Sequence, residues 1–139
     1  MKREIKFRAW DHKQQKMFYL HKMGFLQEEN DLTLVFDDRN SSYIDNYFGF
    51  TDQENFIPLQ YTDLHDKNSR EIYEGDILQD GKEKSVIEFQ WSMWTVVPLR
   101  IYTDPEYIGV DAYKIEFGDK FEVIGNIYEN PELLKEIES

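Results

Sequence analysis

Short segments in which apolar and polar residues alternate run through much of this sequence and predict a mainly β protein. Residues 3–10, REIKFRAW, alternate with the period of a half-buried strand. The polar residues 11–16 predict a turn, and the apolar residues 17–20 predict the return strand of a hairpin. A further strand is expected at 32–36. Residues 43–50 are aromatic without a clean period, so a strand and an irregular helical turn both remain open.

Strand patterns are more closely spaced in the second half of the chain. Asp80-Gly81 is a strong hairpin-turn signal, and the apolar stretches 86–91 and 94–102 follow it. Closely spaced short strands of this kind predict a small barrel-like, strongly curled antiparallel sheet.

Prolines and glycines within these patterns carry more specific predictions. Pro58 and Pro98 lack the N–H that a sheet ladder needs, so each is expected at an edge, at a strand start or at a bend. Gly75-Asp76 predicts a bulge or a close backbone approach inside one strand that begins at Ile72.

Strand periodicity also predicts which side chains share a face of a sheet. Trp91 and Trp94 lie three apart in strand-like sequence and are expected on opposite faces, one filling the core and the other at an interface. Tyr113, Ile115 and Phe117 are expected on one common face of a strand.

The last ten residues, NPELLKEIES, switch to a helical pattern. Asn130 is a good N-cap and Pro131 suits the first helical position. Leu133, Leu134 and Ile137 form one apolar stripe. Because two turns of helix are not stable alone in water, this helix is expected to dock on the sheet or on a neighbouring subunit.

The expected fold class is therefore mainly β, α+β at most. It combines an N-terminal hairpin region, a barrel-like curled antiparallel sheet and a short C-terminal helix. A chain of 139 residues fits a single domain, 1–139, with possible lobes at 1–58 and 59–139.

Composition narrows the class of protein further. The aromatic content of 16% argues against disorder despite the heavy charge. The sequence has no cysteine, which excludes disulfides, thiolate metal sites and cysteine nucleophiles. No apolar run approaches the ~20 residues of a membrane-spanning helix, and a cytoplasmic protein with no membrane partner is expected.

The net charge of −12 is unevenly distributed. Residues 1–23 hold seven basic and two acidic residues, whereas the remaining chain holds nine basic and 26 acidic residues. An acidic body repels phosphate backbones, so nucleic-acid binding is possible only through the N-terminal segment and is not favoured.

No pattern in the sequence indicates catalysis or a bound ion. A calcium loop that began at Asp66 would place Arg70 in a ligand position and would lack its glycine, so a turn that opens a strand explains this stretch better. His12, His21 and His65 lack metal-ligand spacing. We therefore expect no enzyme activity, no cofactor and no metal.

Two features are candidates for binding instead. The first is the basic hairpin, which could grip a phosphate backbone and stack bases or, more simply, pair with the acidic body of its own or another subunit. The second is the tryptophan pair, because Trp is enriched in contact patches, although most such Trp are core residues. The candidate interaction residues are Lys6, Arg8, Trp10, Lys13, Lys16, Trp91 and Trp94.

Three stretches, in this order along the chain, together resemble a known family: REIKFRAWD at 3–11, LQYTDLHDKNSREIYEGDI at 59–77 and VIGNIYENPELL at 123–134. The resemblance is to the YopX family, which is encoded in phages and prophages. It implies a distinctive mainly β fold in a bacterial host and transfers no catalytic residue. The family usually has glycine where this chain has Asp63 and Ser69, which puts a positive φ at these positions in question.

The leading functional hypothesis is a non-catalytic, self-associating interaction module in the host cytoplasm, expected to be homo-oligomeric and open to a host or phage protein partner. Its basic segment and acidic body could meet across a heterologous interface. The alternatives are nucleic-acid binding through the basic hairpin, or an acidic mimic of DNA.

Overall fold

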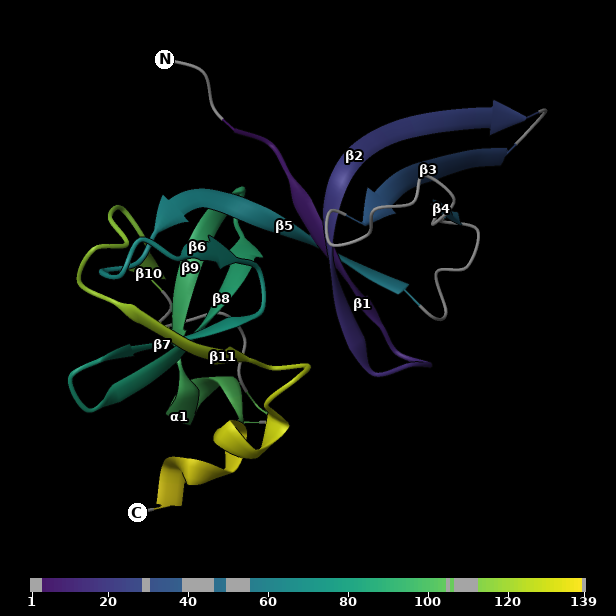
Figure 1. Ribbon diagram of the computed structural model, residues 1–139. Helices are drawn as coiled ribbons and strands as arrows, with labels where there is room; N and C mark the ends of the chain where they lie inside the picture. The colour runs from purple at the N-terminus through teal and green to yellow at the C-terminus, as the bar shows by residue number, and fades with distance from the viewer. Residues whose placement is uncertain are drawn as a thin grey trace. The chain divides into compact units, whose positions relative to one another are not determined.

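The computed structural model describes residues 4–28, 31–38, 47–49, 56–104, 106 and 113–138, and these residues form a mainly β fold (Figure 1). Within the described part of the chain, no helix has the length and apolar character to cross a membrane. The chain divides into two compact units, Glu4–Gln60 and Tyr61–Ser139. This division falls inside strand β5 (Phe56–His65), whose first residues pair with β1 (Phe7–Asp11) and whose last residues pair with β6 (Glu71–Tyr73).

The first unit contains the predicted N-terminal hairpin. Strand β1 pairs with β2 (Lys16–Glu28) from Arg8↔Tyr19 to Asp11↔Lys16, and the Asp11 Oδ1 atom stabilises the turn by accepting the N–H groups of Lys13 and Gln14. Strand β2 extends well past the predicted end at residue 20. It pairs with β3 (Asp31–Asp38), which in turn pairs with β4 (Tyr47–Gly49).

The second unit is built on a five-stranded antiparallel sheet with the order β10-β9-β8-β7-β11. As predicted, a tight turn that contains Gly81 joins the first two strands of this sheet along the chain. The turn consists of Gly81 and Lys82, and Gly81 has a φ of +63°. The strands are β7 (Asp76–Asp80), β8 (Glu83–Gln90), β9 (Met93–Pro98), β10 (Tyr113–Lys114) and β11 (Glu122–Asn126).

Apolar side chains cover both faces of this sheet, because successive residues of a strand point to opposite sides. Leu78 of β7 belongs to a core cluster with Ile87, Val96 and Phe121. Its neighbour Ile77 belongs to a cluster on the other face with Val86 and Leu99.

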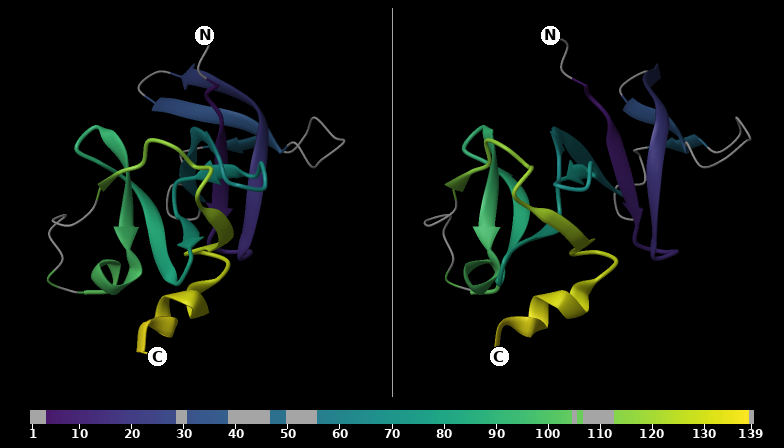
Figure 2. Two further views of the ribbon diagram at one scale, coloured as in Figure 1. Left: turned by 90° about the vertical axis from the view of Figure 1, so that its left-hand side faces the viewer. Right: turned by 60° about the vertical axis from the view of Figure 1, so that its left-hand side comes forward.

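The C-terminal helix docks on the second of these clusters, as its apolar stripe predicts. It is a 3₁₀ helix, η2 (Pro131–Glu138), and Leu133 and Leu134 pack against the cluster. Both views of Figure 2 show η2 and the short helix α1 (Leu99–Tyr102) at the same end of the sheet. The predicted cap is wrong in one respect: the Asn130 Oδ1 atom accepts the N–H of Asn126 and so closes the turn before the helix.

Residues 71–80 form two strands, and the prediction of one strand is wrong. Gly75, at a φ of +86°, turns the chain between β6 and β7, and Tyr73 N donates to Asp76 Oδ2 across this turn. The predicted close approach is confirmed, because Gly75 N donates to Ile87 O while Gly75 O accepts from Ile127 N.

The structure also corrects the predicted strands at 94–102 and 112–117. The stretch 94–102 is a strand only to Pro98. Pro98 has a φ of −52° and directly precedes α1, which begins at Leu99. Of the alternating stretch 112–117, Tyr113 and Lys114 form strand pairs with β9, and Ile115 N donates to Trp94 O of β9. Residues 115–117 lie outside a strand, and Ile115 is buried while Tyr113 and Phe117 are exposed. The predicted fold class, mainly β with a curled antiparallel sheet, is nevertheless confirmed.

Candidate functional site

The polar stretch after β5 is a turn closed by one buried carboxylate. Asp66 Oδ1 accepts the N–H groups of Asn68 and Arg70, each at 2.8 Å. Asp66 Oδ2 accepts the N–H of Val123, 57 residues further along the chain, also at 2.8 Å. Arg70 donates from Nη1 to Val123 O, so the turn is fixed to β11 by bonds in both directions.

These bonds determine the charge state of Asp66. Burial alone would raise the pKa of the carboxyl, but the N–H donors of Val123, Arg70 and Asn68, together with the Arg70 charge, lower it below its ordinary value of 3.8. Asp66 is therefore ionised at neutral pH with its oxygens occupied by backbone donors. The arrangement stabilises the fold and leaves no role for Asp66 as a base.

The two positions where the family usually has glycine keep the conformation that glycine favours. Asp63 has a φ of +68° and Ser69 a φ of +65°. Asp tolerates the left-handed region better than most residues, and Ser69 N is held by Asp66 O at 3.0 Å. The turn thus imposes a positive φ on Ser69 even without glycine, whereas Asp63 lies within β5 at the register shift between Tyr61 and His65.

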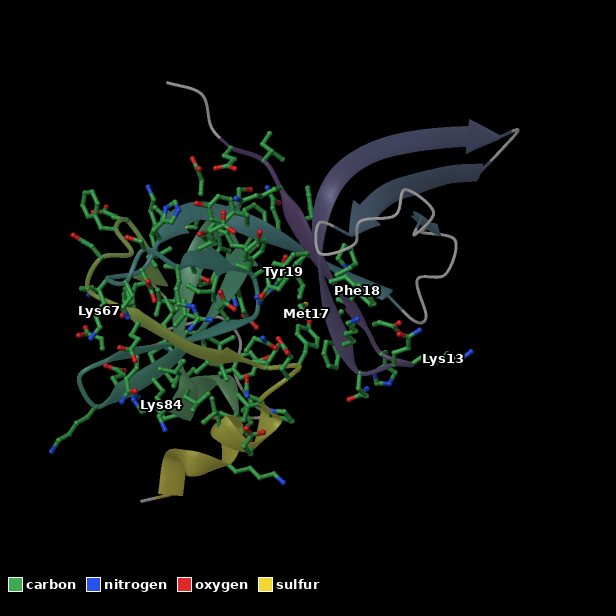
Figure 3. All side chains as sticks on the ribbon, in the orientation of Figure 1. Lys13, Met17, Phe18, Tyr19, Lys67 and Lys84 are labelled. Carbon is green, nitrogen blue, oxygen red and sulfur yellow. The ribbon has the colours of Figure 1, made fainter. Side chains whose placement is uncertain are left out.

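The structure spreads the basic hairpin residues over different environments. Arg8 and Trp10 are buried, and Arg8 Nη1 donates to the Tyr19 hydroxyl at 3.3 Å. Lys6 is half-buried and forms an ion pair with Glu4 at 3.0 Å. Lys13 and Lys16 are exposed, and Figure 3 shows Lys13 at the turn end of the hairpin. Lys2 and Arg3, and the side chain of Lys22, lie outside the described residues.

Trp91 and Trp94 are not on one continuous strand, so the prediction of opposite strand faces is wrong. Trp91 and Ser92 form the two-residue turn between β8 and β9, with φ values of +50° and +61°. Trp94 lies on β9, packs against the core and meets the Phe89 ring edge-on at a centroid distance of 5.0 Å.

Among the residues whose side chains the structure describes, four aromatic side chains of the second unit are exposed. The exposed fractions are 55% for Phe89, 58% for Trp91, 43% for Tyr113 and 72% for Phe117. Of these four residues, only Trp91 is a candidate interaction residue from the sequence, which predicts a common strand face for Tyr113 and Phe117. Phe89 and Phe117 occupy positions that strand alternation assigns to a core face, so their exposure depends on where the strands end.

Tyr113 and Phe117 also line a cavity of about 290 Å³ formed by residues 113–117 and 119–121. The Lys120 ammonium lies over two rings of this cavity, 5.8 Å from the Tyr113 centroid and 4.9 Å from the Phe121 centroid. It also lies 3.9 Å from Asp80 Oδ2. Burial, together with the carboxylates of Glu83 and Asp80, raises the pKa of Tyr113, which keeps its hydroxyl protonated at neutral pH.

Titratable side chains elsewhere in the described residues show no cluster suited to a metal ion. The Tyr61 hydroxyl lies 3.3 Å from His65 Nδ1, and the Tyr61 and Tyr73 rings pack at 5.4 Å. Tyr61 and Tyr73 are buried, so this pair adds to the packing between β5 and β6. The exposed aromatic side chains of the second unit are therefore the candidate interaction residues.

The family model of the YopX protein matches residues 6–135, which is nearly the whole chain. The chain belongs to the YopX family. The β1–β2 and β8–β9 hairpins and the Asp66 turn therefore lie within the residues that the YopX family model matches. None of the curated proteins matches the chain.

Two solved structures share the YopX fold seen here. The chain is similar to protein EF1440 from Enterococcus faecalis, with 24% identity, a TM-score of 0.58 and coverage of 96% of this chain and 99% of that one. It is also similar to protein YopX from Bacillus subtilis, with 20% identity, a TM-score of 0.57 and coverage of 96% and 98%. At these identities the likeness concerns the fold.

Proposed function

We propose that this YopX-family protein is a non-catalytic interaction module that associates with further copies of itself. The proposal is supported mainly by the exposed aromatic side chains of the second unit: Phe89, Trp91, Tyr113 and Phe117. Large aromatic side chains are the residues that most often dominate the energetics of protein interfaces. Their exposure on a free chain costs hydration free energy, which association recovers.

The charge of the same unit limits which partners it can take. Residues 61–139 contain eight basic and 18 acidic residues, for a net charge of −10. Such a surface repels nucleic acid and disfavours close contact between copies except where charge is locally balanced. The proposed setting is the cytoplasm of a bacterial host, with expression from a prophage, and a host or phage protein is a further possible partner.

Native mass, measured by light scattering over a range of protein and salt concentrations, tests the proposal. We expect a mass above one chain that increases with protein concentration. If aromatic contacts oppose like-charge repulsion, added salt strengthens association by screening the repulsion. If instead the basic hairpin binds the acidic body, added salt weakens it. A single-chain mass under every condition would refute self-association.

One observation favours the alternative of nucleic-acid binding. Lys13 and Lys16 are exposed near the tip of the first hairpin, and the Lys16 Nζ atom lies 4.9 Å from the Phe18 ring centroid. Direct binding to DNA would weaken steeply as salt rises, and Lys13→Glu with Lys16→Glu would abolish it. An acidic mimic of DNA would be unaffected by this double substitution and would bind a DNA-binding protein instead.

A further inference from the structure

The turn between β8 and β9 places a large aromatic residue in a conformation that it rarely adopts. A two-residue turn with positive φ at both positions normally contains Asn-Gly or a similar pair. Here Trp91 and Ser92 occupy it with φ values of +50° and +61°. A bulky residue with positive φ is a genuine outlier, and such strain is found most often at functional sites. The strain here holds the indole at the exposed tip of a hairpin.

The cavity at residues 113–121 has the size and lining to receive one aromatic side chain. Its volume of about 290 Å³ lies at the lower limit of the ~300–1,000 Å³ that small-molecule sites usually span. Tyr113, Phe117 and Phe121 supply ring surfaces, and Lys120 supplies a cation beside them. Trp binds cations over its ring face better than other aromatic residues do.

Charge balance distinguishes the hairpin tip and the cavity from the rest of this acidic unit. Residues 89–94, FQWSMW, carry no charge. The cavity lining contains Lys114 and Lys120 together with Glu116 and Asp119, so its formal charge is zero. When two copies with a net charge of −10 in this unit approach each other, contact between these two neutral surfaces avoids like-charge repulsion.

We propose that Trp91 of one copy inserts into the 113–121 cavity of a second copy. The inference rests on the self-association proposed above and identifies its contact. Trp91 is not among the residues that line the cavity of its own chain, so the insertion occurs between copies. The indole would pack against the Phe117 and Tyr113 rings, lie within reach of the Lys120 ammonium, and donate its N–H to Glu116 or Asp119.

This contact joins two different surfaces, and each copy carries one Trp91 tip and one cavity. Two copies can therefore exchange tips about a two-fold axis, or copies can add head to tail until a ring closes or a chain of copies grows. If one variant lacks the tip and a second variant lacks the cavity, the two can form only one contact with each other.

The test uses Trp91→Asn, which removes the indole but suits the turn, and Phe117→Glu, which removes an exposed wall of the cavity. We expect each variant alone to associate at least about tenfold more weakly than the wild type. At a protein concentration at which both proteins are single chains, Trp91→Asn should also melt at a higher temperature than the wild type, which separates loss of contact from loss of fold. Mixed in equal amounts, the two variants should form a 1:1 dimer and nothing larger.

Ile5→Ala is the matched control, because Ile5 is a large apolar residue that is 62% exposed in the other unit. It should associate as the wild type does. If the wild type self-associates while Trp91→Asn is unimpaired, the insertion is wrong but the proposed function stands. Failure of the mixed variants to form a dimer also refutes the insertion. A wild type that is a single chain at all concentrations refutes both.

Discussion

Two turns of the second unit hold residues other than glycine at positive φ, and they differ in what accompanies the strain. At the Asp66 turn, Ser69 lies in a loop whose backbone is bound at both ends by a buried carboxylate and tied to β11. At the β8–β9 turn, Trp91 and Ser92 lie at an exposed tip with the indole in solvent. The comparison teaches that the same conformation can result from internal bonding or can serve to present a side chain.

The largest effect is expected from Asp66→Ala, which removes the acceptor of three backbone N–H groups. Because Val123 N is buried, its lost partner cannot be replaced by water, and we expect a loss of about 3 kcal/mol in the free energy of unfolding. Urea denaturation measures it. Asp66→Asn, which keeps one carbonyl oxygen, should lose less, and equal losses for both variants would contradict this account of the turn.

The same carboxylate makes stability dependent on pH. Since the folded-state pKa of Asp66 lies below its ordinary 3.8, the ionised group stabilises the fold above that pH. This contribution is lost as the pH falls through the folded-state pKa. The difference in unfolding free energy between wild type and Asp66→Asn should therefore narrow as the pH falls from 7 to below 3.8. A difference that stays constant would show that the charge on Asp66 is unimportant.

A smaller effect of opposite sign is expected at the exposed turn. Trp91→Asn should increase the free energy of unfolding by about 1 kcal/mol, because Asn adopts positive φ with less strain than an aromatic residue. Thermal and urea unfolding measure it. A loss of stability would mean that the indole contributes more to packing than its exposure indicates.

The smallest effects are expected from Ser69→Gly and Ser92→Gly. Both serines have nearly the same φ, +65° and +61°. Glycine therefore relieves the same strain at each position and adds the same conformational entropy to the unfolded chain, which folding must remove. We expect matched gains of about 0.5 kcal/mol in urea denaturation, with self-association unchanged. Clearly unequal gains would show that the bonds around Ser69 alter the cost of its conformation.

Local features of the fold could be predicted from the sequence because they depend on neighbouring residues. The first hairpin, the Gly81 turn and the helix that begins at Pro131 all have short-range signals, and all are confirmed. The stretch 112–117 could not be predicted in the same way. Its alternation is real, but pairing with β9 stops after Lys114, and only tertiary contacts decide that.

The candidate site was less accessible to sequence reasoning. Trp91 was recognised as a contact residue, but its place in a turn depends on β8 and β9 pairing from Phe89↔Trp94 to Gln90↔Met93. The exposure of Phe117 and the cavity beside it had no signal in the sequence, since an apolar residue in an alternating stretch indicates a core. Residues from one stretch form this cavity only because Ile115 is drawn into the core between them.

By itself, then, the sequence determined the first hairpin, the turn at Gly81 and the C-terminal helix, because periodic burial and turn chemistry act over a few residues. The tertiary structure alone decided that Asp66 binds Val123, that Arg8 is buried rather than offered to a partner, and that Trp91 projects into solvent. The first outcome joins residues that are 57 positions apart, and the other two depend on the register with which strands pair, which no local pattern encodes.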